Sequence, residues 1–451
     1  MRMKFNKSIQ LLLVAAASLL VAGLVNACGT LTVDFVFVTS ATAAGASNYG
    51  QVDVFEVNSE SGRMRQIPSS PFPSGGRNPV AEAVSSDNTN LYVVNEDDNT
   101  IVQFVIGTDG KLYPANTVNT PGIYPMAVAV SGLNLYVVDL NQPLPTCSNA
   151  SPCSGSVGVF PINPTSGNPP SDVPGPTPLT NGSQSYWPLC QYGYIAATGI
   201  TQCKAGASSD VIVPTGINVL PLNSNPALGT YAYVTAYDTT ASPNVGYIFA
   251  YWVAPAKATA APAGITCPPL PVGATQIPQG TLCAISGGVP VVAGAHPSAI
   301  ASGSDPTGSY VYVTDSINGN VLGFAVQSGL LTALSGSPFP AGNQPSSIIV
   351  DSAYSYAYVT NFLDSTVTAY SISSGELTRI GSYATGLQPT AIGIDPSTKH
   401  FLYTANYLGN TVSGFELSTT AGTLLNSQFS PYPSSTQPTA VAAIPHGTPL
   451  K

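Results

Sequence analysis

QPSSIIVDSAYSYAYVTNFLDSTVTAYSISSGELTRIG (residues 344–381) and QPTAIGIDPSTKHFLYTANYLGNTVSGFELSTTAGTL (residues 388–424) are two copies of one pattern, and they decide the fold. Each copy opens with Gln-Pro and a short apolar segment. A Tyr-rich segment such as AYVTN and two further segments follow, with Gly, Asp, Asn or Ser at every break. Partial two-residue alternation of β-branched and aromatic residues predicts β-strands. One copy is therefore a sheet of four antiparallel strands.

The opening proline recurs along the whole chain, and its spacing predicts the architecture. The positions are Pro79, Pro125, Pro214, Pro297, Pro345, Pro389 and Pro438. Four of the six intervals lie between 44 and 49 residues, which matches one four-stranded blade of a β-propeller. The other two, of 89 and 83 residues, each contain only one Tyr-Val strand, so we interpret them as single blades with long insertions at about 141–210 and 253–290. The Tyr-Val strands number seven, which predicts seven blades.

The two ends of the repeat array indicate how the ring closes. The array begins with FVFVTS (residues 35–40), which is a second-strand type, and it ends with TAVAAIP (residues 439–445), which is a first-strand type. We therefore predict that the C-terminal strand becomes the innermost strand of the first blade, which removes an exposed sheet edge. The predicted fold is all-β, a seven-bladed β-propeller of four-stranded antiparallel blades over residues 28–451, closed by this strand.

Composition excludes several functional classes. Among 451 residues there are 12 Lys and Arg against 21 Asp and Glu, and charged residues make up 7% of the chain, where about 25% is usual. Scattered cations under a net charge of -9 cannot supply the field that a phosphate backbone requires, so nucleic acid is excluded as a partner. Beyond the N-terminal segment there is no second long apolar run to span a membrane.

The first 27 residues have the form of a signal peptide. A cation-rich start, MRMKFNK, precedes the apolar run LLLVAAASLLVAGLV. The junction Leu24-Val25-Asn26-Ala27-Cys28 resembles the lipobox of bacterial lipoproteins, which implies cleavage before Cys28 and lipidation of its thiol. Asn26 is larger and more polar than the residue usual there, so ordinary secretory cleavage after Ala27 is the alternative. We expect export to the bacterial cell envelope, with membrane contact through the lipid anchor only.

Cysteine parity supports this interpretation. Removing Cys28 from the seven cysteines leaves six, which fall into sequential pairs: Cys147 with Cys153, Cys190 with Cys203, and Cys267 with Cys283. Because an export signal leads to an oxidising compartment, we expect three local disulfides. A zinc site is the alternative, but the chain has no C-x-x-C and its three histidines are far apart in sequence. No metal or other cofactor is expected, although a calcium ion held by Asp and Asn oxygens is conceivable.

At this point the strands resemble a known family. AYVTN, LYVVN, VYVTD and QPTAIGIDP are similar to the repeats of YVTN-type seven-bladed β-propellers, the superfamily of lactonase or 6-phosphogluconolactonase-like proteins. The resemblance covers essentially the whole mature chain. It implies the propeller fold strongly and lactonase activity weakly, because these strand motifs are scaffold residues.

Strand order predicts a polar mouth on one rim of the ring. In an antiparallel blade the connection into the first strand and the loop after the second strand share a rim. This brings together the ring before the prolines (Asn78, Tyr124, Val213, His296, Gln344, Gln388 and Gln437) and the ring ending the Tyr-Val strands (Ser40, Asn95, Asp139, Ala236, Asp315, Asn361 and Asn406). From these rings and the adjoining Arg77 we predict ligand contacts by Arg77, Asn78, Asn95, Tyr124, Asp139, His296, Asp315, Gln344, Asn361, Gln388, Asn406 and Gln437. The alternative is that a strand-end Asn or Asp only satisfies its own turn.

Two functions fit this mouth. Lactonases that the chain resembles often carry an Arg-His pair after the blade-opening proline, whereas here the segments read PVAE, PMAV, PTGI, PSAI, PSSI, PTAI and PTAV. Without that pair, our first hypothesis is a monomeric binding scaffold that presents its mouth to a carbohydrate, peptide or protein. The alternative is a lactonase-like hydrolase with His296 and Asp315 as candidate catalytic residues, because histidine is readily poised near neutral pH.

Overall fold

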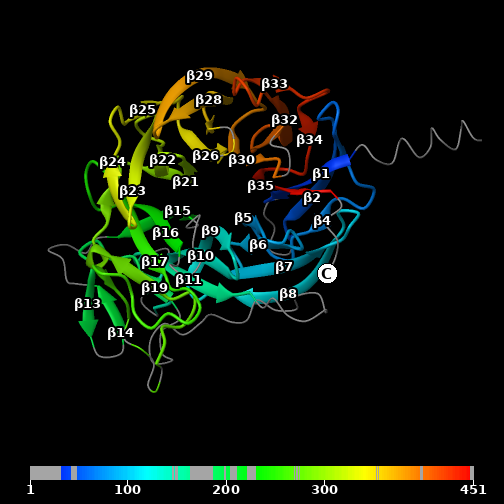
Figure 1. Cartoon of the computed structure of the whole chain (residues 1–451). Coiled ribbons are helices and arrows are strands. Elements are labelled where there is room, and N and C mark those ends of the chain that lie inside the picture. The colour runs from blue at the N-terminus through cyan, green and yellow to red at the C-terminus, as the bar shows by residue number, and fades with distance from the viewer. Residues whose placement is uncertain are drawn as a thin grey trace, which may run out of the picture.

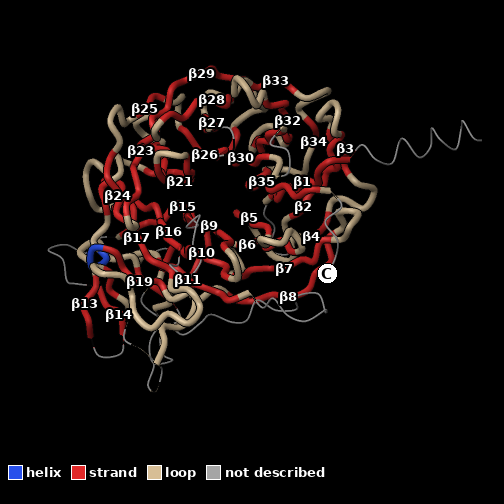
Figure 2. The backbone as a smooth tube through the Cα atoms, in the orientation of Figure 1, coloured by secondary structure: helices blue, strands red, loops and turns tan. Residues whose placement is uncertain are grey.

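The described strands form eight antiparallel sheets, and seven of them are arranged in a ring, as Figure 1 shows. This computed structural model describes residues 32–41, 48–144, 147, 151–162, 186–197, 200–203, 211–220, 230–268, 270, 273, 275–351, 353, 355–396 and 400–446. Nearly all regular structure in these ranges is strand, and one short 3-10 turn, η2 (Ser286–Gly288), is present (Figure 2). No helix in the described part of the chain is long and apolar enough to cross a membrane.

The first four blades follow chain order. Blade 1 contains β35 (Pro438–Pro445), β1 (Thr32–Ser40), β2 (Gln51–Asn58), β3 (Met64–Gln66) and β4 (Phe72–Pro73). Blade 2 contains β5 (Pro79–Val84), β6 (Asn90–Asn95), β7 (Thr100–Ile106) and β8 (Leu112–Asn119). Blade 3 contains β9 (Ile123–Ser131), β10 (Asn134–Asn141), β11 (Ser156–Pro161) and β12 (Tyr186–Pro188). Blade 4 contains β15 (Ile212–Leu220), β16 (Thr230–Asp238), β17 (Val245–Val253), β18 (Ile265–Thr266), β19 (Leu282–Ile285) and β20 (Val291–Val292).

The last three blades repeat the same order. Blade 5 contains β21 (Pro297–Asp305), β22 (Gly308–Asp315), β23 (Asn320–Gln327), β24 (Leu330–Ala333) and β25 (Phe339–Pro340). Blade 6 contains β26 (Pro345–Asp351), β27 (Tyr356–Asn361), β28 (Thr366–Ser373) and β29 (Glu376–Ala384). Blade 7 contains β30 (Pro389–Ile394), β31 (Phe401–Asn406), β32 (Thr411–Leu417), β33 (Leu424–Asn426) and β34 (Tyr432–Pro433). The predicted seven-bladed propeller is confirmed.

The predicted closure of the ring is confirmed as well. Strand β35 pairs antiparallel with β1, and Ile444 lies opposite Phe35 in this register. Both side chains are buried, with 2% and 3% exposed. Blade 1 is therefore built from one C-terminal strand and the strands of the N-terminal segment, so that unfolding of either end removes part of the same sheet.

The two long intervals each hold the strands of one blade, and some of these strands lie within the predicted insertions. Strands β11 and β12 of blade 3 lie inside 141–210, and β18 and β19 of blade 4 lie inside 253–290. These strands are short and separated by Pro-rich stretches, so the two-residue alternation that identifies a strand is hidden in the sequence. A separate hairpin of β13 (Tyr194–Ala197) and β14 (Ile200–Cys203) extends beyond the ring (Figure 1).

The disulfide pairings are borne out as far as the structure describes them. Cys147 is bonded to Cys153, and Cys267 is bonded to Cys283. Cys190 is also disulfide-bonded. The structure does not describe the side chain of Cys203, which is the predicted partner of Cys190. Cys28 and the signal segment also lie outside the described residues.

Buried tyrosines connect neighbouring blades. Tyr312 and Tyr358 are the tyrosines of the Tyr-Val strands in blades 5 and 6, and both are fully buried. Their hydroxyl groups donate hydrogen bonds to backbone carbonyls of the next blade, Gly375 O at 2.8 Å and Gly422 O at 3.3 Å. Both acceptor residues are turn glycines with positive φ, a conformation that glycine adopts without steric cost. The repeated tyrosine is thus a structural contact between blades.

Candidate functional site

The two predicted rings lie at one rim. In five blades, the residue after the second strand donates its backbone N–H to the carbonyl of the residue before the proline, at 2.9 to 3.0 Å: Glu96 to Asn78, Ser316 to His296, Phe362 to Gln344, Tyr407 to Gln388 and Ala41 to Gln437. In the other two blades the strand pairing itself places Asp139 opposite Pro125 and Ala236 opposite Pro214. The structure therefore brings together the residues that strand order predicted for the mouth.

Five residues of the first ring adopt a left-handed backbone conformation. These residues are Asn78, Tyr124, Gln344, Gln388 and Gln437, with φ between 50° and 60°. A non-glycine residue there is strained unless its surroundings hold it. In three cases the preceding blade's turn supplies a hydrogen-bond acceptor for the backbone N–H: Asn99 Oδ1 for Tyr124, Ser365 Oγ for Gln388 and Asn410 Oδ1 for Gln437. The rim is consequently a set of turns fastened blade to blade.

The strand-end ring is buried beneath these turns. Asn95, Asp139, Asp315, Asn361 and Asn406 are each 0% exposed. Asn361, for example, donates from Nδ2 to Thr366 Oγ1 at 3.0 Å and accepts from Gly342 N–H at 2.9 Å. These side chains hold the rim loops in place, as the turn interpretation of strand-end Asn and Asp predicts. A direct ligand contact by them stays a prediction, and it would require the rim to open.

Asp315 is engaged with the backbone around His296. Its Oδ2 accepts from Ala295 N–H at 2.8 Å and from Asn318 Nδ2 at 2.7 Å, and its Oδ1 accepts from His296 N–H at 3.2 Å. The carboxylate thus fixes the segment that carries His296, and the hydrogen bonds found for it do not include the imidazole ring. A positioning role therefore suits Asp315 better than the catalytic role it was a candidate for.

The His296 ring is oriented by two neighbours at the mouth. Ser316 Oγ lies 2.9 Å from Nδ1 and 3.1 Å from the carbonyl oxygen of the same histidine. When the hydroxyl proton is donated to that carbonyl, Nδ1–H is the donor to Ser316. Nε2 then carries a free lone pair. On the other side the Tyr237 ring packs against the imidazole with the ring centroids 4.0 Å apart.

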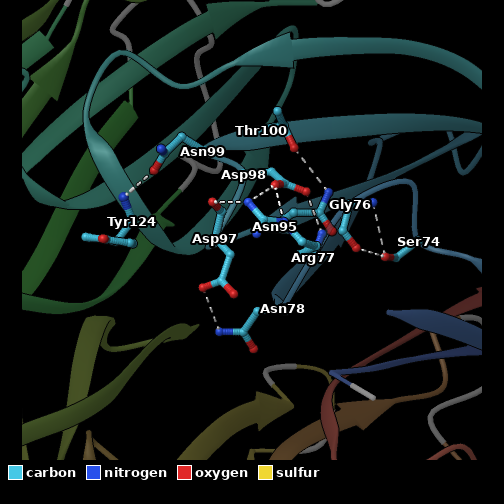
Figure 3. Close-up of polar contacts among 10 residues, drawn as sticks. All are labelled: Ser74, Gly76, Arg77, Asn78, Asn95, Asp97, Asp98, Asn99, Thr100 and Tyr124. Atoms are coloured by element: carbon cyan, nitrogen blue, oxygen red, sulfur yellow. Dashed lines mark hydrogen bonds and ion pairs between the residues drawn. The ribbon is translucent and has the colours of Figure 1, made fainter. Parts of the chain in front are cut away.

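Blade 2 presents a cluster of charges to the same mouth (Figure 3). Arg77 Nε donates to Asp98 Oδ1 at 2.6 Å, and its backbone N–H donates to Asp98 Oδ2 at 2.7 Å. The hydrogen bond with Asp98 raises the pKa of Arg77. Asn78 Nδ2 donates to Glu96 Oε2 at 2.8 Å, and burial, with a contribution from the charge of Asp97, raises the pKa of Glu96. The charge of Arg77 is thus neutralised by Asp98, with the carboxyl groups of Glu96 and Asp97 nearby.

Four of the seven positions directly after the blade-opening prolines have structural partners in the next blade. Ser298 and Ser346 each donate from Oγ to the carbonyl of the next blade's proline at 2.6 Å, and Thr390 and Thr439 do the same from Oγ1 at 3.0 and 2.9 Å. The resemblance places the arginine of an Arg-His pair at these positions. Here they carry hydrogen bonds between blades, so they are not available to hold a phosphate group.

Glu82 is a candidate that the sequence reasoning missed. It lies on β5, three residues after Pro79, where the other six blades have Val or Ile. The residue is half-buried as a whole, but its carboxyl group is buried. The carboxyl accepts from Thr39 Oγ1 at 2.5 Å and from the backbone N–H of Ala442, and its Oε1 has no hydrogen-bond partner among the described residues. Burial raises its pKa to about 7. Alignment of PVAE (residues 79–82) with PTAV (residues 438–441) could have identified Glu82, because a carboxyl group replaces an aliphatic side chain at the fourth position.

A cavity of about 630 Å³ lies on the opposite face of the ring, away from these residues. Its lining includes Phe35, Ile67 and His446, whose imidazole lies 5.2 Å from the Phe35 ring. The basic side chains beside it are paired, Lys111 with Asp109 and Arg65 with Glu56. The cavity therefore has a mixed polar and apolar lining, and its basic side chains are neutralised. Among the described residues no group of three or more potential ligand side chains could hold a metal ion.

Comparison with known proteins defines the family. Residues 35–174 and 293–433 match the family described as Lactonase, 7-bladed beta-propeller, and together they make up more than half of the chain. The protein belongs to this lactonase propeller family. No curated protein matches it.

Solved structures share the fold at low sequence identity. A putative 6-phosphogluconolactonase from Bacteroides fragilis is 18% identical, with a TM-score of 0.62 over 92% of this chain and 98% of that chain. A putative 6-phosphogluconolactonase from Bacteroides uniformis is 17% identical, with a TM-score of 0.61 over 92% of this chain and 100% of that one. The periplasmic gluconolactonase of Pseudomonas aeruginosa is 18% identical, with a TM-score of 0.57 over 91% and 99%. At these identities the likeness concerns the fold alone.

Proposed function

We propose that the protein hydrolyses a lactone without a phosphate group, at the mouth, with His296 as the general base. The observation that carries the proposal is the orientation of His296, whose Nδ1 lies 2.9 Å from Ser316 Oγ. In the tautomer that donates Nδ1–H to this hydroxyl, Nε2 keeps a lone pair for the reaction. Membership of the lactonase propeller family supplies the reaction class. Arg77, the one arginine described at the mouth, is already paired with Asp98, which disfavours a phosphorylated ring.

The reaction requires one base that later acts as an acid. Nε2 of His296 takes a proton from water while the water oxygen forms a bond to the lactone carbonyl carbon. The tetrahedral intermediate then collapses, and the bond between the carbonyl carbon and the ring oxygen breaks. The imidazolium returns its proton to the leaving oxygen, which yields a hydroxy acid. Ser316 and Tyr237 hold the ring in one orientation throughout.

Charge argues for an unphosphorylated substrate. A phosphoryl group is bound by cations, best by arginine in a bidentate contact. Arg77 is the one Lys or Arg that the described chain places at the mouth, and Asp98 already pairs with it, with Glu96 and Asp97 nearby. A dianionic substrate would have to displace Asp98 and approach two further carboxylates. A neutral sugar lactone meets no such repulsion.

The test is an assay of purified protein with glucono-δ-lactone and 6-phosphogluconolactone. We expect hydrolysis of the unphosphorylated lactone above the rate in buffer, and a loss of at least about 100-fold in kcat for His296→Gln, as is usual for a general base. His400→Gln, at an exposed position on the opposite face, is the matched control. Preference for the phosphorylated lactone would contradict the charge argument. Binding of a sugar without turnover would favour the binding scaffold instead.

Export and lipid anchoring remain part of the proposal. Strand β1 starts at Thr32 on the face opposite the mouth and reaches the mouth at Ser40. An acyl group on Cys28 would hold that opposite face toward the membrane, so the mouth would point away from it. Cys28→Ser should move the protein from the membrane fraction to the soluble fraction, because acyl burial supplies about 0.8 kcal/mol per CH₂. A soluble wild type with an unmodified Cys28 would refute the anchor.

A further inference from the structure

Four large aliphatic side chains are exposed in a row on the rim of blades 5 to 7. Ile317 and Leu363 are 62% exposed, and Leu387 and Leu408 are 57% exposed. Ile317, Leu363 and Leu408 lie in the turns between the second and third strands of their blades, and Leu387 lies in the connection into the first strand of blade 7. Single exposed apolar residues are ordinary on protein surfaces, but a contiguous group indicates a binding surface. We call these four residues the apolar strip.

Hydrogen bonds link the successive turns that carry the strip. The backbone N–H of Leu363 donates to Asn343 O, and Ser365 in the same turn accepts from Gln388, the neighbour of Leu387. The carbonyl of Leu387 accepts from Gly409 N–H, next to Leu408. At the other end, Ala341 N–H donates to Gly319 O, which links the turn of Ile317 to the connection that carries Asn343. The strip thus runs along three successive blades.

The strip begins beside the proposed catalytic base. Ile317 directly follows Ser316, whose hydroxyl contacts His296 Nδ1. The acidic turn of Glu96, Asp97 and Asp98 belongs to blade 2, which is separated from blades 5 to 7 by blades 3 and 4 on one side and blade 1 on the other. A ligand centred on His296 therefore has an aliphatic surface on one side and no free cation at the described mouth to attract a negative charge.

We propose that the apolar strip binds the alkyl chain of the substrate, which makes the substrate class an uncharged lactone ring with an aliphatic substituent. The inference rests on the proposed lactone hydrolysis and extends it. Ile317 of the strip directly follows Ser316 at the His296 site, and the absence of an unpaired cation at the described mouth disfavours an anionic substituent. A membrane surface does not suit the strip as a ligand. The proposed lipid anchor at Cys28 lies four residues before the start of β1, which is on the face opposite the strip.

The experiment compares δ-valerolactone with δ-octalactone, δ-decalactone and δ-dodecalactone. We expect kcat/KM to rise about twofold for each methylene, half of the roughly fourfold gain that full burial would give. In Leu363→Asn and Leu408→Asn the ratio of kcat/KM for δ-decalactone to that for δ-valerolactone should fall at least fivefold. Leu425→Asn should keep the wild-type ratio, because Leu425 is equally exposed, at 68%, but lies on the outer strand β33.

The outcomes separate this inference from the proposed function. Hydrolysis with no dependence on chain length overturns the strip and leaves the lactonase proposal standing. If no lactone is hydrolysed, calorimetry with δ-decalactone decides the strip: binding that Leu363→Asn abolishes supports it, and absent or unaltered binding overturns it. Sedimentation that shows a dimer in the wild type and a monomer in Leu363→Asn would assign the strip to a second copy of the chain and overturn the inference.

Discussion

Glu82 Oε2 accepts a hydrogen bond from Thr39 Oγ1 at 2.5 Å, so a carboxyl group on the inner strand of blade 2 holds the N-terminal strand of blade 1. The same carboxyl accepts the backbone N–H of Ala442 on the C-terminal strand. Glu82 therefore contacts both strands that close the ring. In blades 5 and 6 the residues matching Thr39, which are Thr314 and Thr360, donate instead to a carbonyl of their own blade.

The contact makes stability depend on pH in an unusual direction. Burial raises the pKa of Glu82 from 4.5 to about 7, so the folded protein binds a proton that the unfolded chain has lost between these values. The free energy of unfolding then falls as pH rises from about 4.5 to 7, by about 3 kcal/mol for this group. Above pH 7 the contribution of Glu82 to the free energy of unfolding no longer changes with pH.

Glu82→Gln should remove this dependence. The amide keeps an oxygen for Thr39 and Ala442 and carries no charge, so we expect the variant to melt higher than wild type at pH 8 and close to wild type at pH 4.5. Melting curves across this range are the measurement. Glu376→Gln, at an exposed position, controls for the loss of one negative charge. Equal melting temperatures of Glu82→Gln and wild type at pH 8 would contradict the prediction.

Asp139 offers a second substitution with a predicted gain in stability. It is 0% exposed, burial raises its pKa to about 7, and neither its Oδ1 nor Ser156 Oγ opposite it has a hydrogen-bond partner in the described structure. In blades 6 and 7 an Asn at this position donates to the Thr opposite it, at 3.0 and 3.1 Å. Asp139→Asn should form the same bond with Ser156 and stabilise the protein by about 1–3 kcal/mol at pH 8.

The gain from Asp139→Asn should shrink as the pH falls below 7, because the wild-type carboxyl becomes protonated. Chemical denaturation at pH 8 and pH 5 measures the difference. Asn361→Asp, the reverse change in blade 6, should destabilise by a similar amount at pH 8. A destabilised Asp139→Asn protein at both pH values would show that Asp139 has a role that the repeat does not explain.

The sequence predicts the ring because each blade repeats the same local pattern. It does not predict how individual side chains are buried or which distant residues they contact. Pro79 to Pro438 mark the blades, and the register of β1 with β35 follows from the strand types at the ends. The burial of Asn361 and Asp315 could not be predicted. The sequence pattern around a polar residue at a strand end is the same whether its side chain faces a ligand or its own turn. Glu82 was overlooked because its partners, Thr39 and Ala442, are distant in sequence and become neighbours only through ring closure.

Closure itself can be tested at Ile444. The side chain is 2% exposed and packs with Phe35 and Val54 in the core between blades 1 and 2. Ile444→Ala should cost about 2–5 kcal/mol, because it leaves a cavity in the strand that closes the ring. Leu425→Ala, at an exposed position, should change stability by less than about 0.5 kcal/mol. Truncation after Pro438 should be more damaging, since β1 then loses its inner partner, and unchanged melting of the truncated protein would disprove the closure.

The Cys147–Cys153 disulfide is expected to act locally. It joins residues of the loop between β10 and β11, and Cys153 N–H donates to Asn141 Oδ1 at 3.0 Å at the base of that loop. A cross-link over a separation of six residues restricts a short loop, which the chain-entropy model values at about 2 kcal/mol. Because both cysteines lie outside the paired strands of blade 3, replacing both with Ser should speed proteolytic cleavage between residues 142 and 155. Backbone amides of β10 and β11 should keep their protection from hydrogen exchange, and loss of that protection would mean that the disulfide supports the blade itself.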